Sequence, residues 1–292
     1  IKKCYEFKSE TDTEVVAHLL ADLYDGDFEG TVRRVLQRIE GSYSLVILCA
    51  DDPSRIICSK KDNPLVIGLG KGENFIASDI PAIINHTRDT YILNDGEVAV
   101  VTKDSVRVSD LEGNLINKKV YHVTWNAEAA EKGGFEHFML KEIYEQPKAI
   151  RDTLTGRISK DNKEVVFEEL GWEPADVASV NRILITACGT AYHAGLVAKY
   201  YIEQLARIPV EVDIASEYRY RDPLTDKNTL AIVISQSGET SDTLAALKEA
   251  KRRGARSLAV TNVVGSSIAR EANQVIYTWA GPEIAVASTK AY

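Results

Sequence analysis

The sequence predicts an α+β domain followed by an α/β domain, and three observations support this fold class. Between residues 40 and 110, short apolar runs alternate with turn residues, which is typical of antiparallel sheets. From residue 182 onward, apolar runs alternate with helix-like segments, which is typical of a parallel sheet with helices on both faces. A length of 292 residues is sufficient for two such domains.

Two helices are expected before the first strands. The segment Thr11-Asp12-Thr13-Glu14 matches a capping box, and apolar residues follow it at helical spacing, so a helix should begin here. A second helix is expected over residues 28–39. The expected strands of the first domain are residues 43–50, 55–59, 65–69, 74–77, 90–93, 97–102 and 105–108.

Helix signals dominate residues 126–180, and strand signals are few. The stretch "FEHFMLKEIYEQPKAIRDTL" places Phe135, Phe138 and Ile143 on one face of a helix, and Pro147 should restart or kink that helix. We interpret residues 128–174 as a helical connector between the two domains.

The second domain should contain five parallel strands, at residues 183–187, 210–214, 230–234, 257–260 and 275–277. In an open α/β sheet, ligands bind beyond the carboxyl ends of the strands. Three loops rich in small and hydroxylated residues should reach that edge. They are "TACGTAYHAG" after the first strand, "SQSGETSDT" after the third and "AGPEIAVASTK" after the fifth.

The first two of these loops also open helices, whose free N–H groups and positive dipole ends favour an anion. Hydroxyls and N–H groups with little fixed positive charge suit a phosphate monoester on a neutral carbon skeleton. The nucleotide patterns GxxxxGK(S/T) and GxGxxG are absent, which disfavours a nucleotide. The alternative is purely conformational, since Ser, Thr and Gly are common in helix caps and turns. However, Ser235, Ser237 and Thr240 together exceed the one side chain that a cap needs.

Composition excludes several other classes of protein. A formal net charge of -8 disfavours nucleic acid as a partner, and no apolar run approaches the roughly 20 residues of a membrane span. The four cysteines (Cys4, Cys49, Cys58 and Cys188) form no disulfide framework, which favours free thiols in a reducing cytoplasm. The five histidines are scattered, so no metal site is expected.

The motifs of the three loops resemble those of the sugar isomerase (SIS) domain. Together with "KEIYEQP", "LTGRIS" and "ASEYRYR", they resemble the glutamine–fructose-6-phosphate amidotransferase family. "FKSETDTEVVAHL" and "PLVIGLGKGENFIASD" resemble the second half of that family's Ntn-type glutaminase domain. The resemblance implies a partial glutaminase domain at 1–127, the connector at 128–174 and a first SIS domain at 175–292 that is truncated at its end.

The resemblance also implies which residues bind the sugar phosphate. Its phosphate and neighbouring hydroxyls would be held by Ser235, Gln236, Ser237 and Thr240 of the second loop, with Gly189 and Thr190 of the first. The third loop would line the sugar with Val286 and Ser288. One position departs from the family pattern, because Ala191 stands where serine is common and removes one hydroxyl.

In the family, a cysteine thiol releases ammonia from glutamine, and the ammonia aminates fructose 6-phosphate, which is isomerised to glucosamine 6-phosphate without metal or cofactor. Asp12 would hold the α-ammonium of glutamine, or else stabilise the start of a helix. The chain starts at Ile1 and ends in "STKAY", so we expect it to lack the nucleophilic cysteine and a second SIS domain. No catalytic role is therefore assigned within this chain, and we expect it to be inactive alone.

Three further residues have weaker assignments. His193 is more consistent with packing or surface exposure, Glu239 could assist the site without being its base, and Lys290 could neutralise phosphate or form a structural ion pair. A homodimer is expected from the resemblance. The alternatives are a non-catalytic SIS sugar-phosphate sensor and an SIS-type sugar-amine deglycase, neither of which would carry the glutaminase-like segment.

Overall fold

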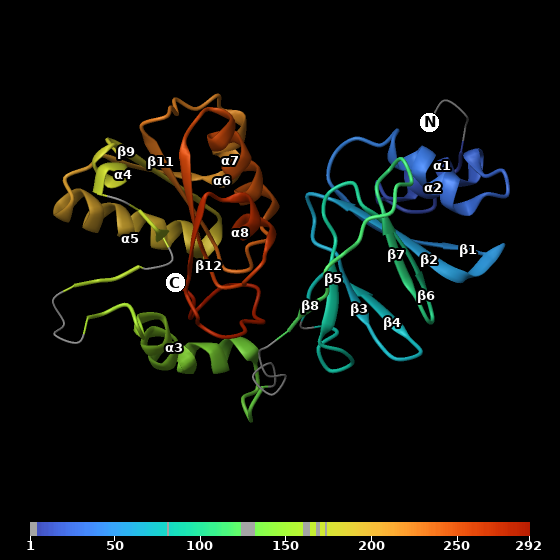
Figure 1. The fold of residues 1–292 in the computed structure, drawn as a ribbon, viewed down its shortest axis with the longest axis horizontal. Helices are drawn as coiled ribbons and strands as arrows, with labels where there is room; N and C mark the ends of the chain where they lie inside the picture. Colours follow the sequence, from blue (N-terminus) through green and yellow to red (C-terminus); the bar gives the residue numbers. More distant parts are fainter. Residues whose placement is uncertain (1–4, 81, 124–131, 160–163, 168–169, 173) are drawn as a thin grey trace. The chain divides into compact units, whose positions relative to one another are not determined.

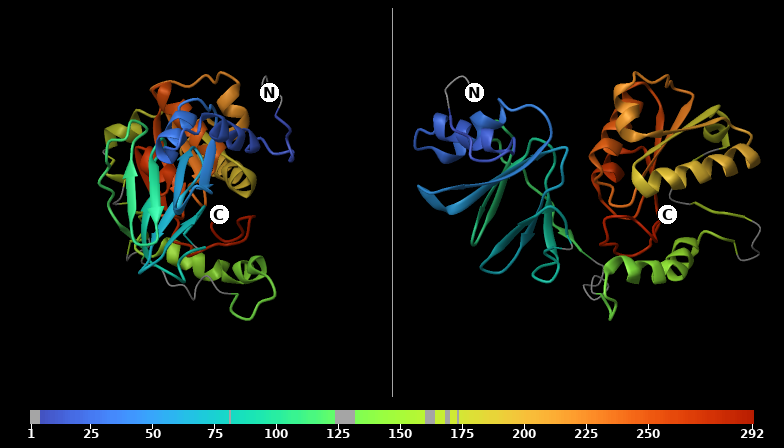
Figure 2. Two further views of the ribbon diagram at one scale, coloured as in Figure 1. Left: turned by 90° about the vertical axis from the view of Figure 1, so that its right-hand side faces the viewer. Right: turned by 180° about the vertical axis from the view of Figure 1, so that it is seen from behind.

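The structure is a computed structural model that describes the chain except for residues 1–4, 81, 124–131, 160–163, 168–169 and 173. Two compact units form, Ile1–Thr124 and Trp125–Tyr292, and each is described by itself (Figures 1 and 2). Within the described residues, no helix is long and apolar enough to cross a membrane.

The first unit contains helices and two antiparallel sheets. Its helices are α1 (Glu14–Leu23) and α2 (Phe28–Leu36). Its strands are β1 (Tyr43–Cys49), β2 (Asp52–Lys61), β3 (Val66–Leu69), β4 (Asn74–Ala77), β5 (Asp89–Ile92), β6 (Val98–Thr102), β7 (Val106–Ser109) and β8 (Tyr121–His122). They form two four-stranded sheets with the orders β1-β2-β6-β7 and β4-β3-β5-β8. The expected strands are confirmed, except that β8 was not anticipated because it has only two residues.

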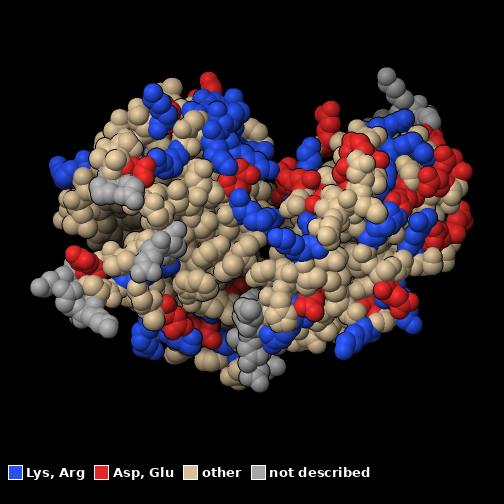
Figure 3. Space-filling view, in the orientation of Figure 1, with Lys and Arg blue, Asp and Glu red and all other residues tan. Residues whose placement is uncertain are grey.

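The alternation of side chains along β6 shows how these layers pack. Val98 and Val100 belong to the cluster that α2 covers with Phe28. Ala99 and Val101 point the other way, into a second cluster that includes residues of β3 such as Ile67. A strand turns successive side chains to opposite faces, so one sheet can separate two apolar layers. Charged side chains of both signs are interspersed on the visible surface of this unit (Figure 3).

The start of α1 differs from the predicted capping box. Thr13 is the N-cap residue and makes no side-chain cap hydrogen bond. Instead, the Glu14 carboxylate accepts hydrogen bonds from the backbone N–H groups of Lys8 at 2.8 Å and Ser9 at 2.7 Å, and from the Ser9 hydroxyl. These bonds, that of the Ser9 hydroxyl first, lower the pKa of Glu14 to about 2. The helix itself is confirmed, but an upstream turn rather than Thr11 satisfies the carboxylate.

The second unit is built on one five-stranded parallel sheet, as predicted. Its strands are β9 (Arg182–Ala187), β10 (Val210–Ile214), β11 (Thr229–Ser235), β12 (Arg256–Thr261) and β13 (Gln274–Tyr277), in the order β10-β9-β11-β12-β13. The helices are α3 (Phe138–Leu154), α4 (Pro174–Ala178), α5 (Gly189–Leu205), α6 (Ala215–Tyr220), α7 (Ser241–Arg252) and α8 (Ser267–Glu271). Helix α3 runs through Pro147 without interruption, so the predicted restart at this residue is wrong.

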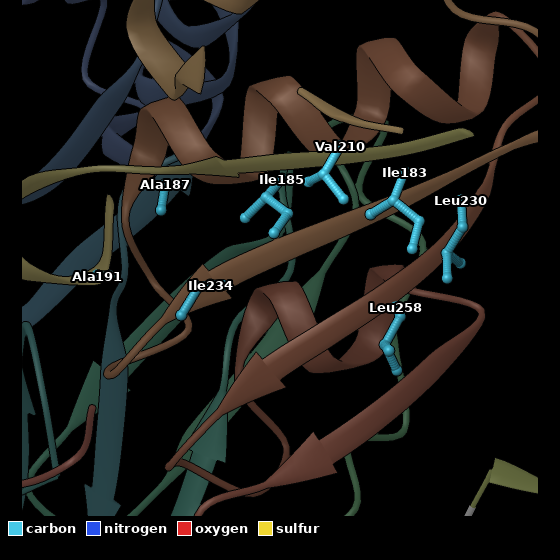
Figure 4. Packing of buried hydrophobic residues seen from close by; sticks show 8 residues of the cluster. All are labelled: Ile183, Ile185, Ala187, Ala191, Val210, Leu230, Ile234 and Leu258. Atoms are coloured by element: carbon cyan, nitrogen blue, oxygen red, sulfur yellow. The ribbon is translucent and has the colours of Figure 1, made fainter. Parts of the chain in front are cut away.

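Helices cover both faces of this sheet. Ile183 and Ile185 of β9 pack with Ala191 of α5 in one cluster (Figure 4). Leu184, which points to the opposite face, packs with residues of α6 and α7. Helix α5 approaches the sheet closely at Gly195, where an added Cβ would lie 2.9 Å from the Ile185 side chain. The sheet is thus buried on both sides, as parallel sheets usually are.

A matched pair of leucine substitutions tests the packing. Leu247 on α7 is completely buried, whereas Leu205 on α5 is 79% exposed. Leu247→Ala should lower the free energy of unfolding by about 2–5 kcal/mol, because it removes buried methyl groups and leaves a cavity. Leu205→Ala should change it by less than about 0.5 kcal/mol. Urea unfolding measures the free energy of unfolding of both variants. Equal decreases in the two variants would contradict the burial of Leu247 and the exposure of Leu205.

Candidate functional site

Two of the three predicted loops meet at the carboxyl edge of the parallel sheet. Strands β9 and β11 are neighbours, with Ala187 opposite Ile234, so the residues that follow them leave the sheet side by side. A hydrogen bond also joins the two loop regions, because the Thr243 hydroxyl in the first turn of α7 lies 3.8 Å from the Cys188 sulfur before α5. The starts of α5 and α7 therefore lie close together.

The hydroxyls of the second loop shape the loop itself. The Ser235 hydroxyl accepts a hydrogen bond from the Gly238 N–H at 3.1 Å and lies 2.9 Å from the Thr240 hydroxyl. The Ser237 hydroxyl accepts one from the Glu239 N–H at 3.1 Å. The conformational interpretation of these residues is thus partly correct, although the bonds lie within the turn and do not cap the helix.

Neither helix at this edge is capped by its N-cap side chain. The N-cap residues are Cys188 for α5 and Thr240 for α7, and neither makes a side-chain cap hydrogen bond. The first N–H groups of a helix have no partner within the helix, and the dipole makes this end positive. Gly189 and Thr190, at the start of α5, are exposed. The edge can therefore accept an anion.

Gly238 is the residue that lets the second loop fold back onto the sheet. Its φ of +66° lies in the left-handed region, and an added Cβ would lie 2.0 Å from the Ser266 hydroxyl oxygen. Its carbonyl accepts a hydrogen bond from the Ile268 N–H of α8 at 2.9 Å, and the Gln236 carbonyl accepts one from the Asn262 N–H at 3.1 Å. The loop is thus fixed against the connection between β12 and α8.

The third loop, residues 280–290, is held by two carboxylates. Glu283 lies within the loop and accepts hydrogen bonds from the Ser288 hydroxyl and from the N–H groups of Thr289 and Lys290. Glu142 of α3 accepts bonds from two further N–H groups of the loop. Val286 is fully exposed at the tip. Among the described residues, no hydrogen bond joins Val286 or Ser288 to the first two loops.

Lys290 is the buried partner in an ion pair with Glu145. Its ammonium lies 2.6 Å from the Glu145 carboxylate, and the lysine side chain is only 3% exposed. Of the two roles considered for this residue, the structure shows the ion pair. Tyr292 is partly buried beside the sheet, where its hydroxyl donates to the Val260 carbonyl at 3.1 Å and burial raises its pKa. Such long-range partners leave no local signal in the sequence.

The other residues singled out in the sequence lie in four different environments. His193 is exposed on α5, with its ring 5.5 Å from that of Tyr192. The Glu239 carboxylate accepts a hydrogen bond from the Ser267 N–H at 2.8 Å and thereby holds the start of α8. Ala191 packs in the apolar cluster under α5. Asp12 lies in the first unit, exposed, just before α1.

Sequence reasoning missed Glu142 and Glu283 as residues that organise the site. Glu142 stands in "KEIYEQP", which indicated the family but no particular contact, and Glu283 stands inside the third loop motif.

No group of three or more His, Cys, Asp or Glu side chains among the described residues could hold a metal ion.

Hollows lie at the opposite, amino-terminal edge of the sheet. One is lined by Arg182, Glu211 and Arg221, and these charged groups already pair with one another. Hydrogen bonds from Arg221 and Arg182 lower the pKa of Glu211 although burial acts in the opposite direction. The paired charges make this hollow a poorer candidate for an anion than the adjacent starts of α5 and α7.

The second unit, with its parallel sheet and hydroxyl-rich strand ends, contains residues 176–292, which match the family model "SIS domain". Over almost its whole length the chain is similar to isomerizing glutamine–fructose-6-phosphate aminotransferases. It is 60% identical to that of Clostridium tetani over 288 residues, which is 99% of this chain and 47% of the relative. It is 52% identical to that of Methanosarcina mazei over 297 residues, 99% of this chain and 48% of the relative.

A solved structure agrees with this relationship. The C-terminal domain of glucosamine-fructose-6-phosphate aminotransferase from Francisella tularensis matches with a TM-score of 0.51 and 44% sequence identity, over 55% of this chain and 45% of that chain. The chain spans about half the length of the curated relatives that it matches.

A matched pair of glycine substitutions tests the geometry of the second loop. Both Gly238 and Gly189 have positive φ, but an added Cβ collides with Ser266 only at Gly238 and meets nothing within 4 Å at Gly189. Gly238→Ala should lower the free energy of unfolding by about 2–5 kcal/mol, from backbone strain and overpacking together. Gly189→Ala should cost about 1–2 kcal/mol from strain alone. Chemical denaturation measures the free energy of unfolding of both variants. A larger decrease for Gly189→Ala than for Gly238→Ala would contradict the structure.

Proposed function

We propose that this chain forms the fructose 6-phosphate site of an isomerizing glutamine–fructose-6-phosphate aminotransferase. That enzyme transfers the amide nitrogen of glutamine to fructose 6-phosphate and isomerises the product to glucosamine 6-phosphate, leaving glutamate. The observation that carries the proposal is the pair of adjacent helix starts, whose N-cap side chains make no cap hydrogen bond, beside the hydroxyl-rich loop at one edge of the sheet.

The phosphate would lie between the starts of α5 and α7. Backbone N–H groups and the hydroxyls of Thr190 and Ser237 would donate hydrogen bonds to its oxygens, and the helix dipoles would favour its charge. Ser235 and Thr240 hold each other at 2.9 Å and would add their remaining hydrogen-bonding capacity, as would Gln236. The only fixed charge in the first turn of α7 is Asp242, and Arg219 pairs with it at 3.0 Å.

The sugar would extend from the phosphate toward the third loop, where Val286 and Ser288 would contact it. Because Ser288 donates to Glu283 at 2.7 Å, its oxygen would act as an acceptor for a sugar hydroxyl.

The first unit would be the second half of the glutaminase domain, in which Asp12 would hold the α-ammonium of glutamine. The similarity to the aminotransferases extends through this unit, which supports the proposal over a sugar-phosphate sensor or a deglycase. The proposal also includes domain limits at 1–127, 128–174 and 175–292, a cytoplasmic homodimer, no nucleic-acid partner, and a reaction without metal or organic cofactor.

Calorimetric titration of the full-length protein with fructose 6-phosphate tests this site. Saturable binding should require the phosphate, so fructose should give no heat. Thr190→Val keeps the shape of the side chain and removes its hydroxyl, and should weaken binding about two- to tenfold through the loss of one hydrogen bond.

Ser179→Ala provides the control for this substitution. Ser179 precedes β9 at the opposite edge of the sheet, where its hydroxyl donates to the Asp176 carbonyl at 2.7 Å. This variant should bind fructose 6-phosphate like the original protein. Equal affinity in Thr190→Val, or tight binding of fructose itself, would reject the proposed phosphate site.

A further inference from the structure

Helix α3 contacts the end of the second unit along one face. The Gln146 amide donates to the Thr289 carbonyl at 2.5 Å, and the Thr153 hydroxyl donates to the Thr278 carbonyl. Ala149 lies between them and packs in a small buried cluster with residues after β13. Positions 142, 146, 149 and 153 recur at helical spacing, so this face of α3 docks on the segment that carries the third loop.

Glu142 adds a buried, charged contact on the same face of α3. Its side chain is almost completely buried, with 2% of the residue exposed. One carboxylate oxygen accepts hydrogen bonds from the N–H groups of Ile284 at 2.6 Å and Ala285 at 3.1 Å. The other oxygen is buried and has no hydrogen-bond partner among the described residues. A buried carboxylate is costly, and a hydrogen bond to a charged group is stronger than a neutral one.

The two N–H groups that Glu142 binds lie next to the tip of the third loop. Ile284 and Ala285 directly precede Val286, the exposed tip of the third loop. Glu283 closes the loop on itself, since its partners are Ser288, Thr289 and Lys290. Glu283 therefore maintains the shape of the loop, whereas Glu142 holds the residues next to its tip against α3.

We propose that Glu142 is a positioning residue for the sugar, acting through the third loop and touching no ligand itself. This inference rests on the proposed function, in which Val286 and Ser288 contact the sugar and the first two loops hold the phosphate. Releasing the loop from α3 should therefore weaken recognition of the sugar and leave recognition of the phosphate intact. A purely structural role for Glu142 would affect both equally or neither.

Titration of the full-length protein with two probes, fructose 6-phosphate and inorganic phosphate, separates these roles. Glu142→Gln keeps an acceptor oxygen and removes the charge, and should weaken fructose 6-phosphate binding about three- to tenfold. Glu142→Ala removes the acceptor and should weaken it more than about tenfold. Binding of inorganic phosphate should change less than about twofold in both variants, since its groups lie on other loops.

Asp152→Asn is the matched control, because Asp152 lies on the same helix and its carboxylate pairs, among the described residues, with Lys148 one turn away at the surface. It should bind both probes like the original protein. Amide hydrogen exchange at Ile284 and Ala285 should accelerate in the Glu142 variants and not in the control. Should Glu142→Ala fail to fold, the milder Glu142→Gln still decides the question.

The outcomes distinguish this inference from the proposed function. Selective loss of fructose 6-phosphate binding, with faster exchange at the two amides, supports Glu142 as the positioning residue. Unchanged binding in Glu142→Gln, or equal weakening of both probes, overturns the inference while the proposed function stands. If the original protein binds neither probe, both the proposed function and the inference are rejected.

Discussion

The parallel pairing of β9 with β11 is the constraint on which the candidate site depends. Neighbouring parallel strands end at the same edge, so the two helices that follow them must start beside each other. Thr243 and Cys188 make contact across this junction. An antiparallel pairing would send one of the two helix starts to the opposite edge and separate the groups that could hold an anion.

The serine hydroxyls at this edge can stabilise the loop and also contact a ligand. Ser235 and Ser237 satisfy N–H groups of their own loop, which keeps a buried turn free of unpaired donors. A serine oxygen that accepts a hydrogen bond still has a proton to donate, so the same side chains can both form the loop and contact a ligand. The positive φ of Gly238 makes this compact turn possible beside Ser266.

Helix α3 of the connector makes more contacts with the rest of the second unit than its charged sequence indicates. Glu142, Glu145 and Gln146 all contact the segment after β13, and Lys290 is buried as the partner of Glu145. A partly buried ion pair is a weak source of stability, but it restricts how the two segments can fit together. The third loop therefore takes its position from a helix that lies far away in the sequence.

The fold class, the five strands of the parallel sheet and the two loops at its carboxyl edge could all be predicted from the amino-acid sequence. Apolar periodicity and turn residues act within a few neighbouring positions, so these features can be read locally. Other features depend on how the segments of the folded chain pack: the hydrogen bonds from Lys8 and Ser9 to Glu14, the division of the first unit into two sheets, and the contacts of Glu142 and Glu145 with the third loop. A buried charge needs a hydrogen-bond partner, and the packing of the segments determines which residue that partner is. Glu142 and Ile284, for example, are 142 residues apart in the sequence.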